Sequence, residues 1–363
     1  MFVPEERVVF TGDTVFSECQ TWLYVSNIDQ WLAALERIRR LDVDIVRVAT
    51  GGAGAFPVIG GFIKAFLRGS IDVTGDTLLR FYAFHVAILP IVTLALIGGA
   101  LAGIDRKLTA RLQGRFGPPI RQPFYDVFKL LQKERIVVNK FQNFNIILFF
   151  IFTVFSGALF FSGADILLMI FSLALAGTFF VLAGYSVSSP YSHLGAEREI
   201  IQMAAYEPMV ILTAVGMYMV TGSFKVADIA LYGKPLILAL PGVFAGFLYI
   251  LTIKFRKSPF DLSMSHHAHQ EIVRGLTTEF SGPALALIEV SHWYENVLLL
   301  GIVYLFFAFN PWLALTVAIV AYLFEIFIDN NYSRFKWQLT FLSSWLFTAV
   351  AGVSNIIVLH LIK

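Results

Sequence analysis

Apolar stretches long enough to cross a bilayer decide what this 363-residue chain can fold into. A spanning helix needs about 20 largely apolar residues. Eight stretches qualify, near residues 81–104, 144–161, 165–187, 200–221, 235–253, 284–307, 312–328 and 342–361. Only 14% of the residues are charged, against about 25% in soluble domains. The sequence therefore predicts an all-α integral membrane protein with about eight transmembrane helices.

Basic residues gather in the segments that follow the first, fifth and seventh stretches. They are Arg106, Lys107, Arg111, Arg115, Arg121, Lys129, Lys133, Arg135 and Lys140, then Lys254, Arg256, Lys257 and Arg274, then Arg334 and Lys336. Lys and Arg stay on the cytoplasmic side of a membrane. We therefore expect a multi-pass protein of the plasma membrane, with two long cytoplasmic loops that carry amphipathic helices. The 162–164 gap predicts a tight helical hairpin.

The N-terminal 80 residues do not follow this pattern. Residues 1–50 have a mixed, soluble character and are too few for a well-buried core. They show none of the order expected of a signal peptide. Cys19 is the only cysteine, which excludes an internal disulfide and an iron–sulfur cluster held by this chain, since a cluster takes about four thiolates. The net charge of +2 gives no sign of nucleic-acid binding.

Several ionisable residues lie inside the apolar stretches, where they are costly and mark functional sites. They are Glu207 in the fourth stretch, Glu289, His292 and Glu295 in the sixth, and Glu325 and Asp329 in the seventh. Acids partly withdrawn from water bind protons more tightly, so a series of them predicts a proton path. The alternative is that these groups cap helices or pair with Lys and Arg at the membrane edge.

The first basic loop contains a rigid turn, "GRFGPP", followed by "FYDVFKLLQKE". The second sequence alternates apolar and polar residues with helical spacing, which predicts an amphipathic helix. Such a helix serves equally well as a lipid anchor or as a platform for a partner.

The second loop carries His266, His267 and His269 in the run "SHHAHQE". Histidines at this spacing can hold a metal, but a closed site needs about three or four ligands with supporting hydrogen bonds. No second cluster elsewhere matches them. The pattern favours a polar docking loop, and we expect no metal in this chain.

From about residue 100 to its end, the chain resembles the H-type "heel" membrane subunit of respiratory complex I. The matching positions are Gly117, Pro118, Gln122, Pro123, Asp126, Lys129, Lys133 and Glu134 in the first loop, and Pro259, Phe260, Asp261, Glu279, Phe280, Ser281 and Gly282 in the second. The resemblance implies eight spans and a subunit without catalytic residues.

The run "LSMSHHAHQE", together with residues 188–209, is similar to the corresponding subunit of energy-converting [NiFe] hydrogenases, which include formate hydrogenlyase. This resemblance implies that a redox module docks on the loops and that its energy drives H⁺ or Na⁺ movement. The expected partners are the hydrogenase large and small subunits, an iron–sulfur subunit and antiporter-like membrane subunits. They would hold the [NiFe] centre and the Fe–S clusters, and this chain would hold no cofactor.

The same resemblance assigns roles to matched positions. An acidic connection to the redox module would consist of Glu197, Glu199, Asp261, Glu271 and Glu279. Partner docking would involve Arg115, Gln122, Asp126, Lys129, His266, His267 and His269.

Two further resemblances concern the N-terminal part of the chain. Residues 1–50 resemble a piece of a metallo-β-lactamase fold, but the His motifs that would join Asp13 as metal ligands are absent. Residues 51–104, a linker and the first span, resemble cytochrome b, but His85 lacks the second histidine pair that haem requires. Residues 105–363 then form the heel-like membrane domain.

Three other functions compete with the hydrogenase-type subunit. A quinone-dependent heel subunit would carry an acid-rich run after Pro259, Phe260 and Asp261, where this chain has histidines. A haem-binding electron carrier would depend on His85. A stand-alone channel or transporter would be expected to show inverted repeats, and none is evident. The sequence leaves the coupling ion and the electron donor open.

Overall fold

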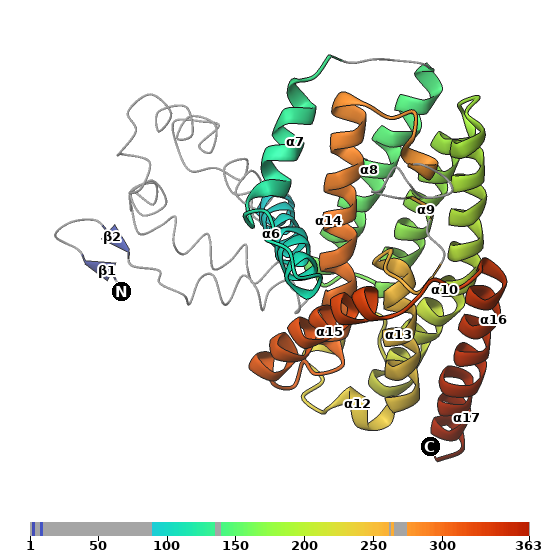
Figure 1. Ribbon diagram of the computed structural model, residues 1–363. Helices are drawn as coiled ribbons and strands as arrows, with labels where there is room; N and C mark the ends of the chain where they lie inside the picture. Colours follow the sequence, from blue (N-terminus) through green and yellow to red (C-terminus); the bar gives the residue numbers. More distant parts are fainter. Residues whose placement is uncertain are drawn as a thin grey trace. The chain divides into compact units, whose positions relative to one another are not determined.

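The computed structural model describes residues 2–3, 8–9, 89–134, 139–260, 263–264 and 274–362 (Figure 1). The chain divides into two compact units, Met1–Pro90 and Ile91–Lys363. In the first unit, the two-residue strands β1 (Phe2–Val3) and β2 (Val8–Val9) pair antiparallel. The predicted residues Asp13 and His85 lie outside the described part of the chain.

The second unit is helical. Its elements are α6 (Leu89–Leu112, which begins in the first unit), α7 (Gln122–Gln132), α8 (Lys140–Phe161), α9 (Ile166–Tyr185), α10 (Pro190–Thr221), α11 (Val226–Ala230), α12 (Leu236–Ala239), α13 (Pro241–Lys254), the 3₁₀ turn η3 (Gly275–Thr277), α14 (Gly282–Leu305), α15 (Pro311–Asn331), α16 (Trp337–Phe347), the π-helical turn η4 (Thr348–Val353) and α17 (Ser354–Ile362). Five segments are long and apolar enough to cross a membrane, namely α8, α9, α10, α15 and the continuous α16–η4–α17. The predicted all-α membrane architecture is confirmed at this level.

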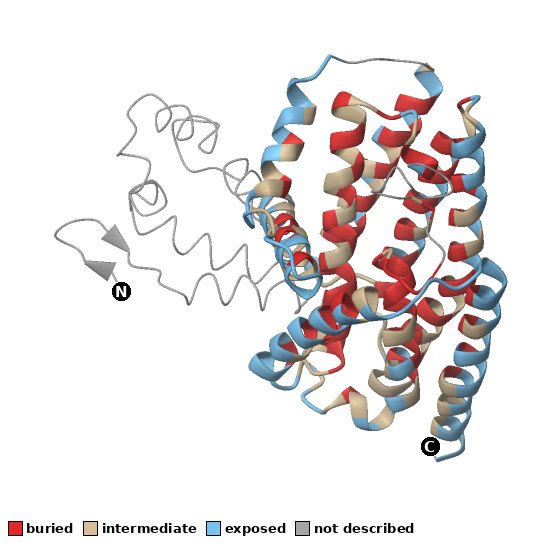
Figure 2. Cartoon of the chain, in the orientation of Figure 1, coloured by how far each residue is buried: buried red, intermediate tan, exposed pale blue. Residues whose placement is uncertain are grey.

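Buried residues face the interior of the helical unit and exposed residues its outside (Figure 2), and the exposed set includes many large apolar side chains, whereas some polar side chains are buried. Trp312 and Leu361 are 80% and 78% exposed, whereas Thr153 and Ser156 are buried and donate to the carbonyls of Phe149 and Phe152. In water this surface would be unfavourable, but in lipid the apolar face contacts hydrocarbon and internal hydrogen bonds satisfy the polar groups.

The predicted hairpin and the predicted amphipathic helix are both present. Helices α8 and α9 pack along their length, and Phe149 stacks on Phe180 with ring centroids 4.9 Å apart. Helix α7 turns Val127 toward α14, where Val127 joins Trp293 in one buried apolar cluster. The next residue of α7, Phe128, is 61% accessible.

Two helices begin or end differently from the sequence-based expectation. Helix α6 continues to Leu112, so Arg106, Lys107 and Arg111 are helical and not part of a loop. Lys, Arg and Leu are good helix formers, and the helix stops just before Gly114, whose φ is +69°. Helix α10 starts at Pro190, and Glu197 and Glu199 therefore lie within it and not on a loop. Proline fits the first helical turn because its missing N–H would be unsatisfied there anyway.

Pro208 lies inside α10, where it cannot donate to the carbonyl of Ala204. Helix α16 supplies donors at this point. Trp345 Nε1 donates to the Ala204 carbonyl at 3.1 Å, and the Ser344 hydroxyl donates to the Ala205 carbonyl at 2.6 Å. The proline is therefore tolerated because a neighbouring helix satisfies the freed backbone group.

The predicted span 235–253 is broken, because Leu240 separates α12 from α13. Pro241 can begin a helix but cannot continue one. The Asn355 side chain from α17 accepts from the amides of Gly242 and Val243 at 2.9 and 3.1 Å, and so caps the start of α13. A Cβ on Gly242 would clash with the Ala351 carbonyl oxygen, so this close approach requires glycine.

Candidate functional site

Arg256 lies just beyond the end of α13 and connects two other helices. It is the one non-glycine residue in the described ranges with a positive φ, at 55°. This backbone region is costly for a residue with a side chain, and it is found mostly where the surrounding structure enforces it. The turn directs the Arg256 guanidinium toward α10 and α14.

Two buried glutamates receive the Arg256 guanidinium. Nη2 donates to Glu199 of α10 at 3.2 Å, and Nη1 donates to Glu295 of α14 at 3.1 Å. Only 4% of each carboxylate side chain is exposed, against 16% of the arginine. The Ser263 hydroxyl also donates to Glu199. We call Glu199, Arg256, Glu295 and His292 the Arg256 cluster.

His292 completes the Arg256 cluster one turn before Glu295 on α14. Its Nδ1 lies 3.0 Å from Glu295 Oε2, the oxygen that also accepts from Arg256. The imidazole ring centroid lies 5.7 Å from that of Phe149 and 5.5 Å from that of Phe180. His292 Nε2 is buried and has no hydrogen-bond partner among the described residues.

The charges around Arg256 keep it protonated. Burial alone would lower the pKa of the guanidinium, but Glu199 and Glu295 more than offset this effect, and the pKa lies above its usual value. Lys254 lies nearby, with its ammonium 4.0 Å from the centroid of the Tyr206 ring. Glu207, the next residue on α10, is half-buried and interacts electrostatically with Lys254.

Lys257 enters a second group of charges, which we call the Lys257 cluster. Its ammonium pairs with Asp105 of α6 and, at 3.3 Å, with Asp329 of α15. Asp329 also accepts from the backbone amide of Ser258 at 2.8 Å. Burial would lower the pKa of Lys257, but the two aspartates raise it above its usual value.

The predicted proton-path residues do not form one group. His292 and Glu295 are in contact, and Glu207 interacts with Lys254 beside them. Glu325 is buried on α15 and hydrogen-bonded to Thr252, with its Oε2 unpaired. Glu289 is half-buried and makes no hydrogen bond within the described ranges. Their roles in proton transfer stay predictions.

The predicted acidic connection is only partly visible. Glu199 is in the Arg256 cluster, whereas Glu197 and Glu279 are exposed. Glu279 lines an open hollow of about 490 Å³ beside Pro190 and Tyr191. Asp261, Glu271, His266, His267 and His269 lie outside the described residues. Over residues 89–134, 139–260 and 274–362, no three metal-ligating side chains come together.

The predicted docking residues of the first loop lie on or beside α7. Gln122 donates to Asp126 at 2.9 Å, and Arg106 pairs with Asp126 at 2.5 Å. Arg115 and Lys129 are exposed.

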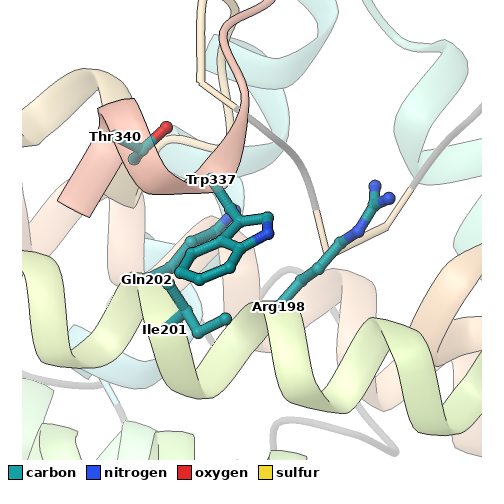
Figure 3. A pocket seen from close by; sticks show the side chains of 5 residues that line it. All are labelled: Arg198, Ile201, Gln202, Trp337 and Thr340. Atoms are coloured by element: carbon teal, nitrogen blue, oxygen red, sulfur yellow. The ribbon is translucent and has the colours of Figure 1, made fainter.

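A depression between α10 and the start of α16 is too narrow for a water-sized molecule (Figure 3). Its lining consists of Arg198, Ile201, Gln202, Trp337 and Thr340.

Sequence reasoning missed the cations that organise both clusters. Arg256 and Lys257 count as loop charges in the orientation argument, and Asp105 attracts no notice at the end of an apolar stretch. The available signal is a group of three cations, Lys254, Arg256 and Lys257, that follows an apolar segment containing no acid of its own.

Comparison with known proteins places most of the chain in one family. Residues 84–360 match the family model described as NADH dehydrogenase. Residues 42–106 match the model for cytochrome b/b6/petB, and residues 1–49 match the metallo-beta-lactamase superfamily.

Several membrane-complex subunits are similar in sequence. Hydrogenase-4 component C of Escherichia coli (strain K12) is 31% identical over 229 residues, which are 58% of this chain and 71% of that protein. Formate hydrogenlyase subunit 4 of the same organism is 26% identical, covering 68% and 89%. The H-type subunit of NADH-quinone oxidoreductase from Ehrlichia chaffeensis is 29% identical, covering 63% and 71%.

A solved structure shares the fold. It is a chain of the membrane-bound sulfane sulfur reductase, an archaeal respiratory membrane complex, with a TM-score of 0.64 and 24% identity. The likeness covers 75% of this chain and 99% of that one.

Proposed function

The chain belongs to the NADH dehydrogenase family, and we propose that it anchors and couples an energy-converting, hydrogenase-type complex. In this role it docks a redox module and links redox chemistry to H⁺ or Na⁺ translocation, without catalysing the redox step itself. Similarity to subunits of hydrogenase-4 and formate hydrogenlyase supports the complex type. The observation that carries the coupling role is the buried Arg256 cluster, because charges withdrawn from water in a membrane protein usually serve ion or proton movement.

The proposal includes an arrangement in the membrane. The chain has eight spans in the plasma membrane, with the long basic loops in the cytoplasm. Its partners are the [NiFe] hydrogenase large and small subunits, an iron–sulfur subunit and antiporter-like membrane subunits. The [NiFe] centre and the Fe–S clusters reside in those partners. The basic residues on and around α7 support the orientation.

A quinone-dependent complex is the second candidate, because the H-type subunit of NADH-quinone oxidoreductase is also similar to this chain. Purification through a tag on this chain separates the two. Nickel and dye-linked hydrogen oxidation in the purified complex support the hydrogenase type, whereas quinone reduction without nickel supports the other.

The coupling role is tested by Glu207→Gln in the assembled complex. Glu207 is half-buried and close to the Arg256 cluster through Lys254. We expect dye-linked hydrogen chemistry to stay unchanged and ion translocation into vesicles to fall about tenfold or more, since a missing proton-transfer group typically costs at least that much. The exposed Asp228→Asn on α11, which also neutralises one carboxylate, is the control. Full translocation in Glu207→Gln removes this residue from the path.

A further inference from the structure

We propose that His292 is the proton carrier of the Arg256 cluster. It takes up and releases a proton at Nε2, while Glu199 and Glu295 stay ionised. This inference rests on the proposed coupling function and names the group that would change its charge during coupling. The proton exchanges with water, so uptake converts hydronium to water and release reverses the exchange.

Hydrogen-bond chemistry fixes the state of His292 Nδ1. Glu295 Oε2 accepts from Arg256 Nη1 at 3.1 Å and lies 3.0 Å from His292 Nδ1. An ionised carboxylate can only accept, so Nδ1 must carry a hydrogen to make this contact. A neutral imidazole has one N–H, and His292 Nε2 is therefore the nitrogen that gains or loses a proton.

The carboxylates are poor proton carriers because they are already bound. One guanidinium donates to both, through separate nitrogens, and Ser263 donates to the second oxygen of Glu199. Arginine does not lose its proton in proteins. Protonating either carboxylate would leave a buried guanidinium nitrogen facing a neutral acid, which is costly in a low-dielectric site.

The charged groups around the Arg256 cluster have a net negative charge that one additional proton would neutralise. Glu199 and Glu207 come from α10, Glu295 from α14, Lys254 from α13 and Arg256 from the segment that follows it. Tyr206 of α10 is uncharged, and α8 and α9 present the rings of Phe149 and Phe180. At the centre of the cluster, two carboxylates face the single guanidinium of Arg256, and a protonated His292 balances the excess negative charge.

The surroundings of Nε2 suit a transfer site. Glu295 orients the ring from one edge, and two phenylalanine rings restrict its rotation. Nε2 is buried and unpartnered among the described residues. Buried polar atoms are normally hydrogen-bonded. An unpartnered Nε2 is therefore suited to bind a water molecule or to accept a proton. Histidine is the side chain that changes charge between about pH 5 and pH 8.

Nitrogen NMR of the full chain in lipid nanodiscs, with ¹⁵N-labelled histidine, tests the assignment directly. We expect one ring whose Nδ1 stays protonated while Nε2 gains a proton as the pH falls from about 9 to about 5. His292→Asn should remove this signal, because asparagine can still donate to Glu295 but cannot titrate. If His292→Asn does not accumulate, His292→Gln makes the same assignment. A ring that keeps one state throughout, or that loses its proton from Nδ1, overturns the proposal.

A second measurement uses the assembled complex. His292→Asn should lower ion translocation about tenfold or more and flatten its pH dependence, with dye-linked redox activity retained. His360→Asn, at an exposed histidine on α17, is the matched control and should leave both unchanged. Full translocation with an unchanged pH profile in His292→Asn contradicts the proposal. If the wild-type complex moves no ions, the proposed function fails, but the NMR titration still decides which nitrogen exchanges its proton.

Discussion

Arg256 and Lys257 are neighbours in the sequence, yet their side chains enter different clusters. The left-handed backbone at Arg256 turns the two cations apart, one toward α10 and α14 and the other toward α6 and α15. Each cation meets two carboxylates. The carboxylates around Arg256 are 4% exposed, whereas Asp105 and Asp329 are 20% and 26% exposed.

Both clusters consist of one cation between two carboxylates, but they differ in how deeply the carboxylates are buried, and this difference indicates different roles. In the Arg256 cluster, the two carboxylates are almost fully buried, and His292 contacts one of them. In the Lys257 cluster, solvent reaches the acids, the contacts join α6 to α15, and no histidine of the described residues pairs with either acid. We infer that the first cluster serves coupling and that the second mainly holds helices together.

Arg256→Met should have the largest effect on stability. It leaves Glu199 and Glu295 buried without their cation, and breaking a buried pair in this way costs about 3–5 kcal/mol. Denaturant titration in mixed micelles measures the free energy of unfolding. Lys129→Met, at an exposed cation on α7, is the control and should change it by no more than about 0.5 kcal/mol. A small loss for Arg256→Met would show that the cluster is hydrated and would remove the contrast between the two clusters.

Lys257→Met should cost less, about 1–3 kcal/mol by the same titration. Asp105 and Asp329 can rehydrate, and Asp329 keeps the amide of Ser258 as a donor. Dye-linked activity and ion translocation should persist in the folded protein. Loss of translocation with normal stability would instead place the Lys257 cluster in the ion path.

Salt should change the ion-pair coupling energies of the two clusters differently, and this effect should be smaller than those of the substitutions above. Double-mutant cycles give the coupling energy between Lys257 and Asp105 and between Arg256 and Glu295. Raising the salt from about 0.1 M to about 1 M should weaken the first coupling by a few tenths of a kcal/mol, since partly exposed charges are screened. The second should stay constant within error. Equal salt sensitivity would mean that both clusters are open to solvent.

Much of the fold follows from the apolar stretches, because a bilayer imposes helix length and composition. Each stretch contains a helix in the described residues, and the α8–α9 hairpin and the amphipathic α7 agree with their patterns. The extension of α6 into its basic end and the start of α10 at Pro190 differ from the prediction. Hydropathy marks where lipid ends, whereas helical structure continues as far as its residues and caps allow.

The candidate site was less accessible to sequence reasoning. The cost of charge in an apolar stretch identifies Glu295 and His292 from the sequence. Arg256 is not found in this way, because its position depends on a single left-handed residue and on two helices distant in the sequence. Hydropathy does not report tertiary pairing of that kind.

The hydrogen bonds that Ser344 and Trp345 of α16 donate to α10 have a consequence for folding during synthesis. A ribosome completes α10, with Pro208 in it, long before Trp345 is synthesised 141 residues after Ala204. During that interval the Ala204 carbonyl lacks its final partner. The helix that carries Glu199 and Glu207 therefore reaches its finished form only after the segment that carries Trp345 has entered the bilayer.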